Sequence, residues 1–148
     1  MQVKMLIDKK YKSMEIHVCN DEKNDSVTQM VKDIEGFVNI RLPGTDERGE
    51  KVMLNPQEII RFYAQNQKVM AQDTKGVYSV QKKLYELEEI LDTMDLFRIS
   101  KSEIINLRKV RSLDINMVGT IKVILIDGTE TYTSRRNVTR LKKKLGLK

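Results

Sequence analysis

Short apolar runs separated by turn residues are the feature that most constrains how the last two thirds of this chain can fold. From Val52 onward the chain is a series of such short runs, a pattern that predicts β-strands, and Gly76 supports a turn between two of them. Asp127 and Gly128 lie between two such runs, and this dipeptide strongly favours a two-residue hairpin turn. The predicted strands are residues 52–54, 59–63, 68–72, 77–80, 96–100, 103–107, 114–118, 120–126 and 129–133.

Two segments of this region have helical instead of strand periodicity. In residues 81–91, Leu84, Leu87 and Leu91 share one face, which predicts an amphipathic helix packed on a sheet. A short basic helix is expected over residues 135–145, with Ser134 as its cap and Gly146 at its end. The fold class that follows is α+β: mainly antiparallel β, with one embedded helix and one C-terminal helix.

The first 36 residues predict a small module of two strands and a helix. Residues 3–7 form a short apolar run, and in residues 14–19 apolar side chains alternate along the chain, as a half-buried strand requires. Ser26 and Gln29 have the spacing of a capping box, and Gly36 is expected to end the helix that follows.

A turn-rich, charged segment separates this module from the strands. Residues 43–50 combine Pro, Gly, Asp and Glu and show no apolar periodicity, so we place a boundary there. Residues 37–42 are compatible with either side of it. The expected domains are residues 1–45 and residues 46–148.

Positive charge is concentrated at the C-terminal end of the chain. Residues 1–93 carry 14 Lys and Arg against 16 Asp and Glu, whereas residues 94–148 carry 13 against 5. The net charge is therefore −2 for the first part and +8 for the second. A basic region of this size predicts an anionic partner.

The sequence gives little support to an enzyme. It has one His and one Cys, and it lacks a Gly-rich phosphate loop, a nucleophile elbow and a cluster with metal-ligand spacing. We therefore expect no catalytic residue, no metal, no cofactor and no small-molecule substrate. A single Cys, no signal peptide and no apolar run long enough to span a bilayer predict a cytoplasmic protein.

Nucleic-acid binding is better supported, because basic residues lie next to small hydroxyl and amide side chains. Lys and Arg neutralise phosphate charge, while Ser and Asn donate hydrogen bonds to phosphate oxygens. A helix beginning at Ser134 would add backbone N–H groups. The chain has no Trp and only three Phe and five Tyr to stack on single strands, so we favour duplex DNA.

Three segments resemble the LytTR family of bacterial DNA-binding domains. They are residues 97–107, Phe-Arg-Ile-Ser-Lys-Ser-Glu-Ile-Ile-Asn-Leu, residues 133–138, Thr-Ser-Arg-Arg-Asn-Val, and residues 54–63, Leu-Asn-Pro-Gln-Glu-Ile-Ile-Arg-Phe-Tyr. The resemblance covers roughly residues 50–147. It implies an elongated antiparallel β fold that contacts DNA through loops, and a transcription regulator that recognises paired direct repeats.

The resemblance also implies which residues contact DNA. It places base contacts at Gln67 or Lys68, at Lys101 and at Arg136. The phosphate contacts that it implies, together with those suggested by the basic clusters, are Arg98, Ser100, Ser102, Ser134, Arg135, Asn137 and Arg140.

The first 45 residues depart from a frequent family arrangement, in which a phosphorylation receiver domain precedes the DNA-binding domain. They are too short for a receiver and lack its acidic pocket, so phosphoryl control is not expected. The resemblance admits a homodimer on direct repeats and a regulatory membrane-protein partner. Two alternatives stay open: an RNA-binding or ribosome-associated basic protein, and an interaction module whose basic end meets an acidic protein.

Overall fold

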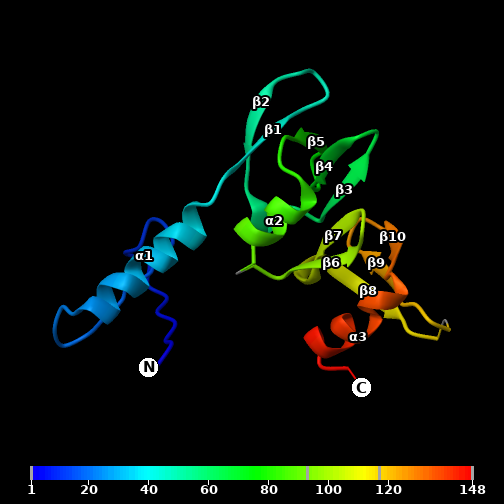
Figure 1. Cartoon of the computed structure of the whole chain (residues 1–148). Helices are drawn as coiled ribbons and strands as arrows, with labels where there is room; N and C mark the ends of the chain where they lie inside the picture. Colours follow the sequence, from blue (N-terminus) through cyan, green and yellow to red (C-terminus); the bar gives the residue numbers. More distant parts are fainter. Residues whose placement is uncertain (1, 93, 117, 148) are drawn as a thin grey trace. The chain divides into compact units, whose positions relative to one another are not determined.

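A computed structural model describes residues 2–92, 94–116 and 118–147 of the chain (Figure 1). It consists of two compact units, Met1–Asn39 and Ile40–Lys148. The division falls six residues before the boundary expected from the sequence, because the segment after Asn39 enters a sheet of the second unit. No helix in the described part of the chain is long and apolar enough to cross a membrane.

The first unit contains one helix, α1, Asp25–Asn39. Its start was predicted wrongly at Ser26: the cap is Asn24, whose Oδ1 accepts a hydrogen bond from the Val27 N–H at 3.0 Å. The helix also continues past Gly36, where the sequence predicted its end. Gly36 does not adopt the left-handed conformation with which a glycine commonly ends a helix.

The two strands predicted before α1 are absent. Residues 3–7 and 14–19 have extended or irregular backbone without strand pairing. No described residue of this unit is buried, so there is no core on which a half-buried strand could pack. The predicted strand–strand–helix module is therefore wrong in its strands and right in its helix.

The second unit is built around a seven-stranded antiparallel sheet with the order β2-β1-β5-β4-β3-β7-β6. The strands predicted at 68–72, 77–80 and 96–100 have the predicted bounds. The strands are β1 (Leu42–Thr45), β2 (Lys51–Leu54), β3 (Arg61–Gln65), β4 (Lys68–Gln72), β5 (Val77–Val80), β6 (Leu96–Ser100) and β7 (Glu103–Asn106).

Strand β1 was not predicted, because Pro43 and Gly44 are typical of turns. It pairs with β2 from Leu42 opposite Leu54 to Thr45 opposite Lys51. Gly44 is required by packing: a Cβ at this position would lie 2.8 Å from Leu54 Cδ1. The absence of a side chain therefore lets β1 approach Leu54 closely.

A second sheet has three antiparallel strands, β8 (Val110–Asp114), β9 (Lys122–Leu125) and β10 (Glu130–Tyr132), in the order β10-β9-β8. The predicted hairpin around Asp127-Gly128 is confirmed, but the predicted two-residue turn is wrong: Glu130 pairs with Ile124 and the Leu125 N–H donates to the Thr129 carbonyl, so residues 126–128 form a three-residue loop in which Gly128 has a φ of 87°. The strand predicted at 114–118 is wrong, because β8 ends where the Asn116 N–H donates to Asp114 Oδ1. Residue 117 lies outside the described residues.

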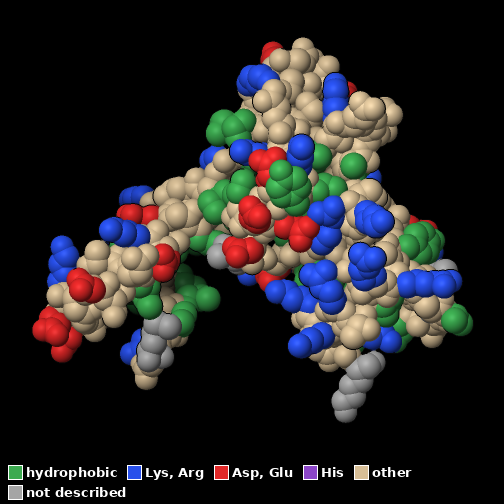
Figure 2. All heavy atoms as spheres, in the orientation of Figure 1, with side chains coloured by type: hydrophobic (Ala, Val, Ile, Leu, Met, Phe, Trp, Pro, Cys, Tyr) green, Lys and Arg blue, Asp and Glu red, His purple; other side chains and the backbone are tan. Residues whose placement is uncertain are grey.

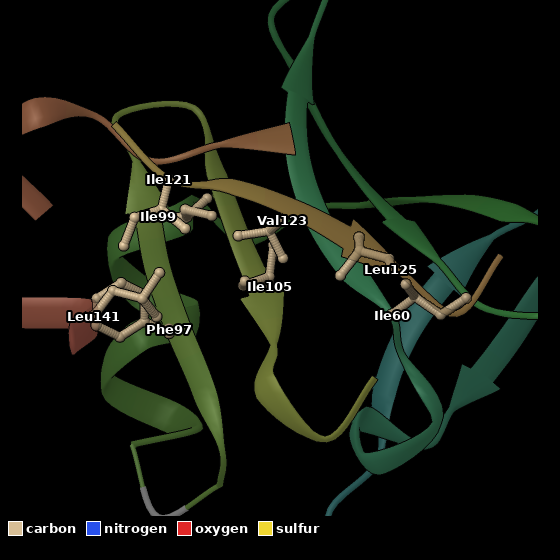
Figure 3. Close-up of a cluster of buried hydrophobic side chains, with 8 residues drawn as sticks. All are labelled: Ile60, Phe97, Ile99, Ile105, Ile121, Val123, Leu125 and Leu141. Carbon is tan, nitrogen blue, oxygen red and sulfur yellow. The ribbon is translucent and has the colours of Figure 1, made fainter. Parts of the chain in front are cut away.

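The three-stranded sheet packs against one face of the larger sheet, and helix α3 (Arg135–Lys144) closes this core (Figure 3). The larger sheet and its approach to β3 contribute Ile60, Phe97, Ile99 and Ile105, the smaller sheet and its approach to β9 contribute Ile121, Val123 and Leu125, and α3 contributes Leu141. Leu141 is fully buried, so the basic helix is anchored by an apolar side chain.

The other face of the larger sheet is covered by α2, Leu84–Ile90, which contacts β3, β6 and β7. Because successive strand residues point to opposite faces, Ile104 lies on this face while Ile105 belongs to the core on the opposite side. All four residues of β7 are buried as a result. The mainly antiparallel α+β class expected from the sequence is confirmed.

A polar network crosses between the two sheets. Glu103, only 8% exposed, accepts hydrogen bonds from Arg61 Nη1 at 3.1 Å and from the Thr131 hydroxyl at 2.5 Å. Arg61 Nε donates to Gln72 Oε1 at 2.7 Å, and Gln72 Nε2 donates to Asp127 Oδ2 at 2.5 Å. These contacts fix the three-stranded sheet to β3, β4 and β7.

Candidate nucleic-acid interface

The β3–β4 turn carries the first predicted base-contacting residues. Gln65 pairs with Lys68, so the turn consists of Asn66 and Gln67, whose φ values are 50° and 63°. Positive φ at both central positions is the geometry of a type I′ hairpin turn, which matches the twist of the flanking strands. Gln67 and Lys68 are both exposed.

The β6–β7 turn lies beside the end of β3. The Ala64 N–H donates to the Ser102 carbonyl at 2.8 Å, immediately before the β3–β4 turn begins. Lys101 stands in this turn with an exposed side chain. Ser100 and Ser102 flank it with their hydroxyl oxygens 3.4 Å apart. The two turns therefore project from the same end of the sheet.

The start of α3 joins the same end of the molecule. The Ser134 N–H donates to the Ile99 carbonyl at 3.0 Å, which places the first turn of α3 beside the last residues of β6. Ser134 occupies the N-cap position as predicted, although its side chain makes no capping bond to the backbone. Arg135 and Arg136 follow it and are exposed.

The structure thus brings the predicted base-contacting residues to one end of the second unit. Gln67 and Lys68 lie in and next to the β3–β4 turn, Lys101 lies in the β6–β7 turn, and Arg136 lies in the first turn of α3. Backbone hydrogen bonds link these three turns. Figure 2 shows Lys and Arg side chains gathered on the face of the second unit where α3 and β6 lie in Figure 1.

The residues predicted to contact phosphate differ in their solvent exposure. Ser102, Arg135 and Arg140 are exposed, while Ser100 and Ser134 are half-buried. Arg140 also has an internal contact, because its guanidinium lies over the Phe97 ring with its carbon 5.6 Å from the ring centroid.

Two residues that were predicted to contact phosphate, Asn137 and Arg98, make hydrogen bonds within the protein. Asn137 is 6% exposed, its Nδ2 donates to Ser134 Oγ, and its Oδ1 accepts from Arg140 Nη1. Arg98 donates to Glu88 and to two backbone carbonyls of the β6–β7 turn. Internal hydrogen bonds therefore engage the polar side chains of both residues in the described structure.

Sequence reasoning missed a fourth loop at this end, which contains residues 118–120 between β8 and β9. Gly119, with a φ of 77°, lies under the Arg135 side chain: a Cβ there would be 3.5 Å from Arg135 Nε. The Thr120 hydroxyl donates to the Thr133 carbonyl at 2.6 Å, next to the start of α3. The loop therefore supports Arg135, and a glycine shortly before a strand was the available signal.

The network of Glu103, Arg61 and Thr131 was also missed. Glu103 follows the β6–β7 turn directly, so its two accepted hydrogen bonds fix the chain where the turn ends. A carboxylate beside the apolar residues Ile104 and Ile105 was the available signal, since charged groups are rarely buried without a partner.

Comparison with known proteins identifies the family. The family model described as the LytTr DNA-binding domain matches residues 49–146. The chain belongs to the LytTR family. The matched residues all lie within the second unit, Ile40–Lys148, and do not include β1.

Two bacterial relatives and one solved LytTr domain structure are also similar to this LytTR chain. An uncharacterized HTH-type transcriptional regulator of Staphylococcus aureus strain MSSA476 is 28% identical over 99% of both chains. Another from strain NCTC 8325 / PS 47 is 34% identical over 64% of each chain. The LytTr domain of a Bacillus cereus protein described as a methyl-accepting/DNA response regulator matches with a TM-score of 0.68 at 16% identity, covering 72% of this chain and 97% of that one.

The name HTH-type borne by these relatives does not describe the fold of this LytTR chain. A helix-turn-helix needs two helices joined by a short turn. Among the described residues, α1 and α2 are separated by five strands, and α2 and α3 by another five. If this domain binds a groove of DNA, its turns and the start of α3 are the elements available for contact.

Proposed function

We propose that this LytTR protein is a transcription regulator that binds duplex DNA in a sequence-specific manner through the three turns at one end of its sheet. The observation that carries the proposal is the pair of backbone hydrogen bonds, Ala64 to Ser102 and Ser134 to Ile99, that ties these turns together. They give exposed side chains from distant parts of the sequence a fixed separation, which recognition of a base sequence requires.

The chemistry of these side chains suits base edges in the major groove. Arg136 can donate two parallel hydrogen bonds to guanine O6 and N7, and Gln67 can pair with adenine N6 and N7. Lys101, or Lys68 in place of Gln67, can donate to guanine. Ser102, Ser134 and Arg135 would then hold the register on phosphates, a role that fixes orientation without selecting a sequence.

The first experiment identifies the site. The purified full chain is used to select binders from a random duplex library, and fluorescence anisotropy then compares the selected duplex with a scrambled one of equal length. We expect a Kd for the selected duplex that is lower by about 10³-fold or more. Equal affinity for both duplexes, or stronger competition by a structured RNA of equal charge, would contradict the proposal and favour a general nucleic-acid binder.

Arg136→Ala tests the contact on α3. We expect the loss of about 1–3 kcal/mol on the selected duplex and little change on the scrambled one, because a base contact contributes only to the specific complex. The matched control is Arg111→Ala. Arg111 is exposed near the start of β8, at the end of that strand away from the loop that contacts Arg135. Equal losses of Arg136→Ala on both duplexes would make Arg136 a phosphate contact.

The arrangement of sites is a further part of the proposal. The LytTR resemblance implies paired direct repeats, and two copies on one face of DNA need repeats separated by a whole number of helical turns, each about 10–10.5 base pairs. Inserting half a helical turn of DNA between the two repeats should abolish simultaneous binding of two protein copies in a gel-shift assay, whereas binding of one copy should remain. A homodimer on such repeats and a regulatory membrane-protein partner rest on the resemblance alone.

A further inference from the structure

Arg98 and Glu88 form a support under the β6–β7 turn. Arg98 Nη1 lies 2.5 Å from Glu88 Oε1 on α2. The same guanidinium donates through Nε to the Ser100 carbonyl at 2.7 Å and through Nη2 to the Lys101 carbonyl at 2.5 Å. Three separate donors of the Arg98 side chain therefore connect helix α2 with the backbone carbonyls of Ser100 and Lys101.

The backbone at this point needs such support. The β6–β7 register shifts between Arg98 and Ser100, which marks a β-bulge. A bulge interrupts the regular ladder and changes the direction of the chain, and bulges frequently serve to aim a side chain. Only the planar fork of an arginine presents donors in the geometry that reaches a carboxylate and two carbonyls at once.

We propose that Glu88 and Arg98 are positioning residues that fix the orientation of Lys101 for recognition of DNA. The inference rests on the proposed function and deepens it, because it assigns α2 a part in sequence recognition. Glu88 holds the guanidinium, the guanidinium holds the carbonyls of Ser100 and Lys101, and the turn presents the Lys101 side chain. Arg98 itself is 22% exposed and contacts no DNA in this account.

Charge gives this proposal a test with a distinctive sign. Glu88→Gln removes one negative charge from a DNA-binding protein, which by electrostatics alone strengthens binding to any duplex. Weakening of the charged bond to Arg98 would instead loosen the turn and weaken only the specific complex. The control is Glu89→Gln on the same helix, which removes the same charge from an exposed neighbour of Glu88.

We expect Glu88→Gln to raise the Kd for the selected duplex about 3- to 10-fold. This increase is smaller than the one expected when a base contact is lost completely. The Kd for the scrambled duplex should stay equal or fall. Glu89→Gln should leave the ratio of the two Kd values unchanged. Arg98→Lys, which keeps the charge but lacks the fork, should reproduce the effect of Glu88→Gln; circular dichroism melting confirms that each variant is folded at the assay temperature.

Combination with Lys101→Ala separates positioning from general loss of stability. If Glu88 and Arg98 act through Lys101, their variants have no further effect on the selected duplex in the Lys101→Ala background. Additive losses in that background, or a Glu88→Gln variant as specific as the wild type, overturn the positioning role. A Lys101→Ala variant with wild-type affinity overturns the assigned contact of Lys101 as well, so the two failures are distinguishable.

Discussion

Replacement of Gln67 by glycine should stabilise the protein while it weakens recognition of DNA. Gln67 has a φ of 63°, a left-handed conformation that costs a residue with a Cβ about 1–2 kcal/mol. Glycine avoids that cost but gains about 0.5–1 kcal/mol of additional chain entropy in the unfolded state. The net expectation for Gln67→Gly is a gain of about 0.5–1 kcal/mol in the free energy of unfolding.

The assay pairs two measurements on the same sample. Chemical denaturation gives the free energy of unfolding, and anisotropy with the selected duplex gives the Kd. Gln67→Ala is the matched control, because it removes the same polar group but retains a Cβ at positive φ, so it should weaken binding to the same extent without the gain in stability. A Gln67→Gly variant that is less stable than the wild type refutes the strain argument, and one with unchanged affinity refutes the DNA contact.

Two further substitutions and one pH dependence test the scaffold. Leu141→Ala removes the fully buried anchor of α3 and should destabilise the second unit by about 2–5 kcal/mol in chemical denaturation. Gly44→Ala places a methyl group 2.8 Å from Leu54 Cδ1 and should cost about 1–3 kcal/mol. Burial raises the pKa of Asp127, but hydrogen bonds from Thr129 and the charge of nearby Arg61 outweigh the effect of burial, and the pKa is lowered overall. The ionised carboxylate therefore stabilises the folded protein at pH values above its unfolded pKa of about 3.9. This stabilisation is lost as the pH falls through the lower pKa of the folded state.

Each of these has a control. Leu147→Ala removes the same atoms from a side chain that is 39% exposed and should change stability by less than about 0.5 kcal/mol. Gly36→Ala introduces a Cβ with no atom within 4 Å in α1, so it should not destabilise the protein. For Asp127, the Asp127→Asn variant should lose less stability than the wild type between pH 5 and pH 3; parallel curves for the two proteins would contradict the assignment.

The strands of the second unit could be predicted from sequence wherever a local pattern carried the information. The runs at 68–72, 77–80 and 96–100 and the hairpin around Asp127-Gly128 all depend on residues close in the chain. Strand β1 could not be found in this way. Its Pro43 and Gly44 are tolerated because Leu54 and Tyr78 approach from other strands, and no local pattern contains that information.

The candidate site was predictable in its location and less so in its details. The family resemblance placed Lys101 and Arg136 on loops. The structure has both side chains exposed at one end of the sheet, with Lys101 in a turn but Arg136 in the first turn of helix α3. The resemblance did not distinguish Arg98 from Arg135, because both are basic residues within two positions of a serine in the sequence. Arg98 is engaged by Glu88, ten residues away on a different element, and only the fold shows this pairing.

Backbone hydrogen bonds between Ala64 and Ser102 and between Ile99 and Ser134 join the turns without depending on which side chains those turns display. Exchange of an exposed residue at a turn therefore leaves the geometry of its neighbours intact. Under the proposed function, single substitutions at these tips are then sufficient for the promoter preference of duplicated genes to diverge. The same independence makes this end of the domain a practical starting point for recoding a regulator toward a chosen operator.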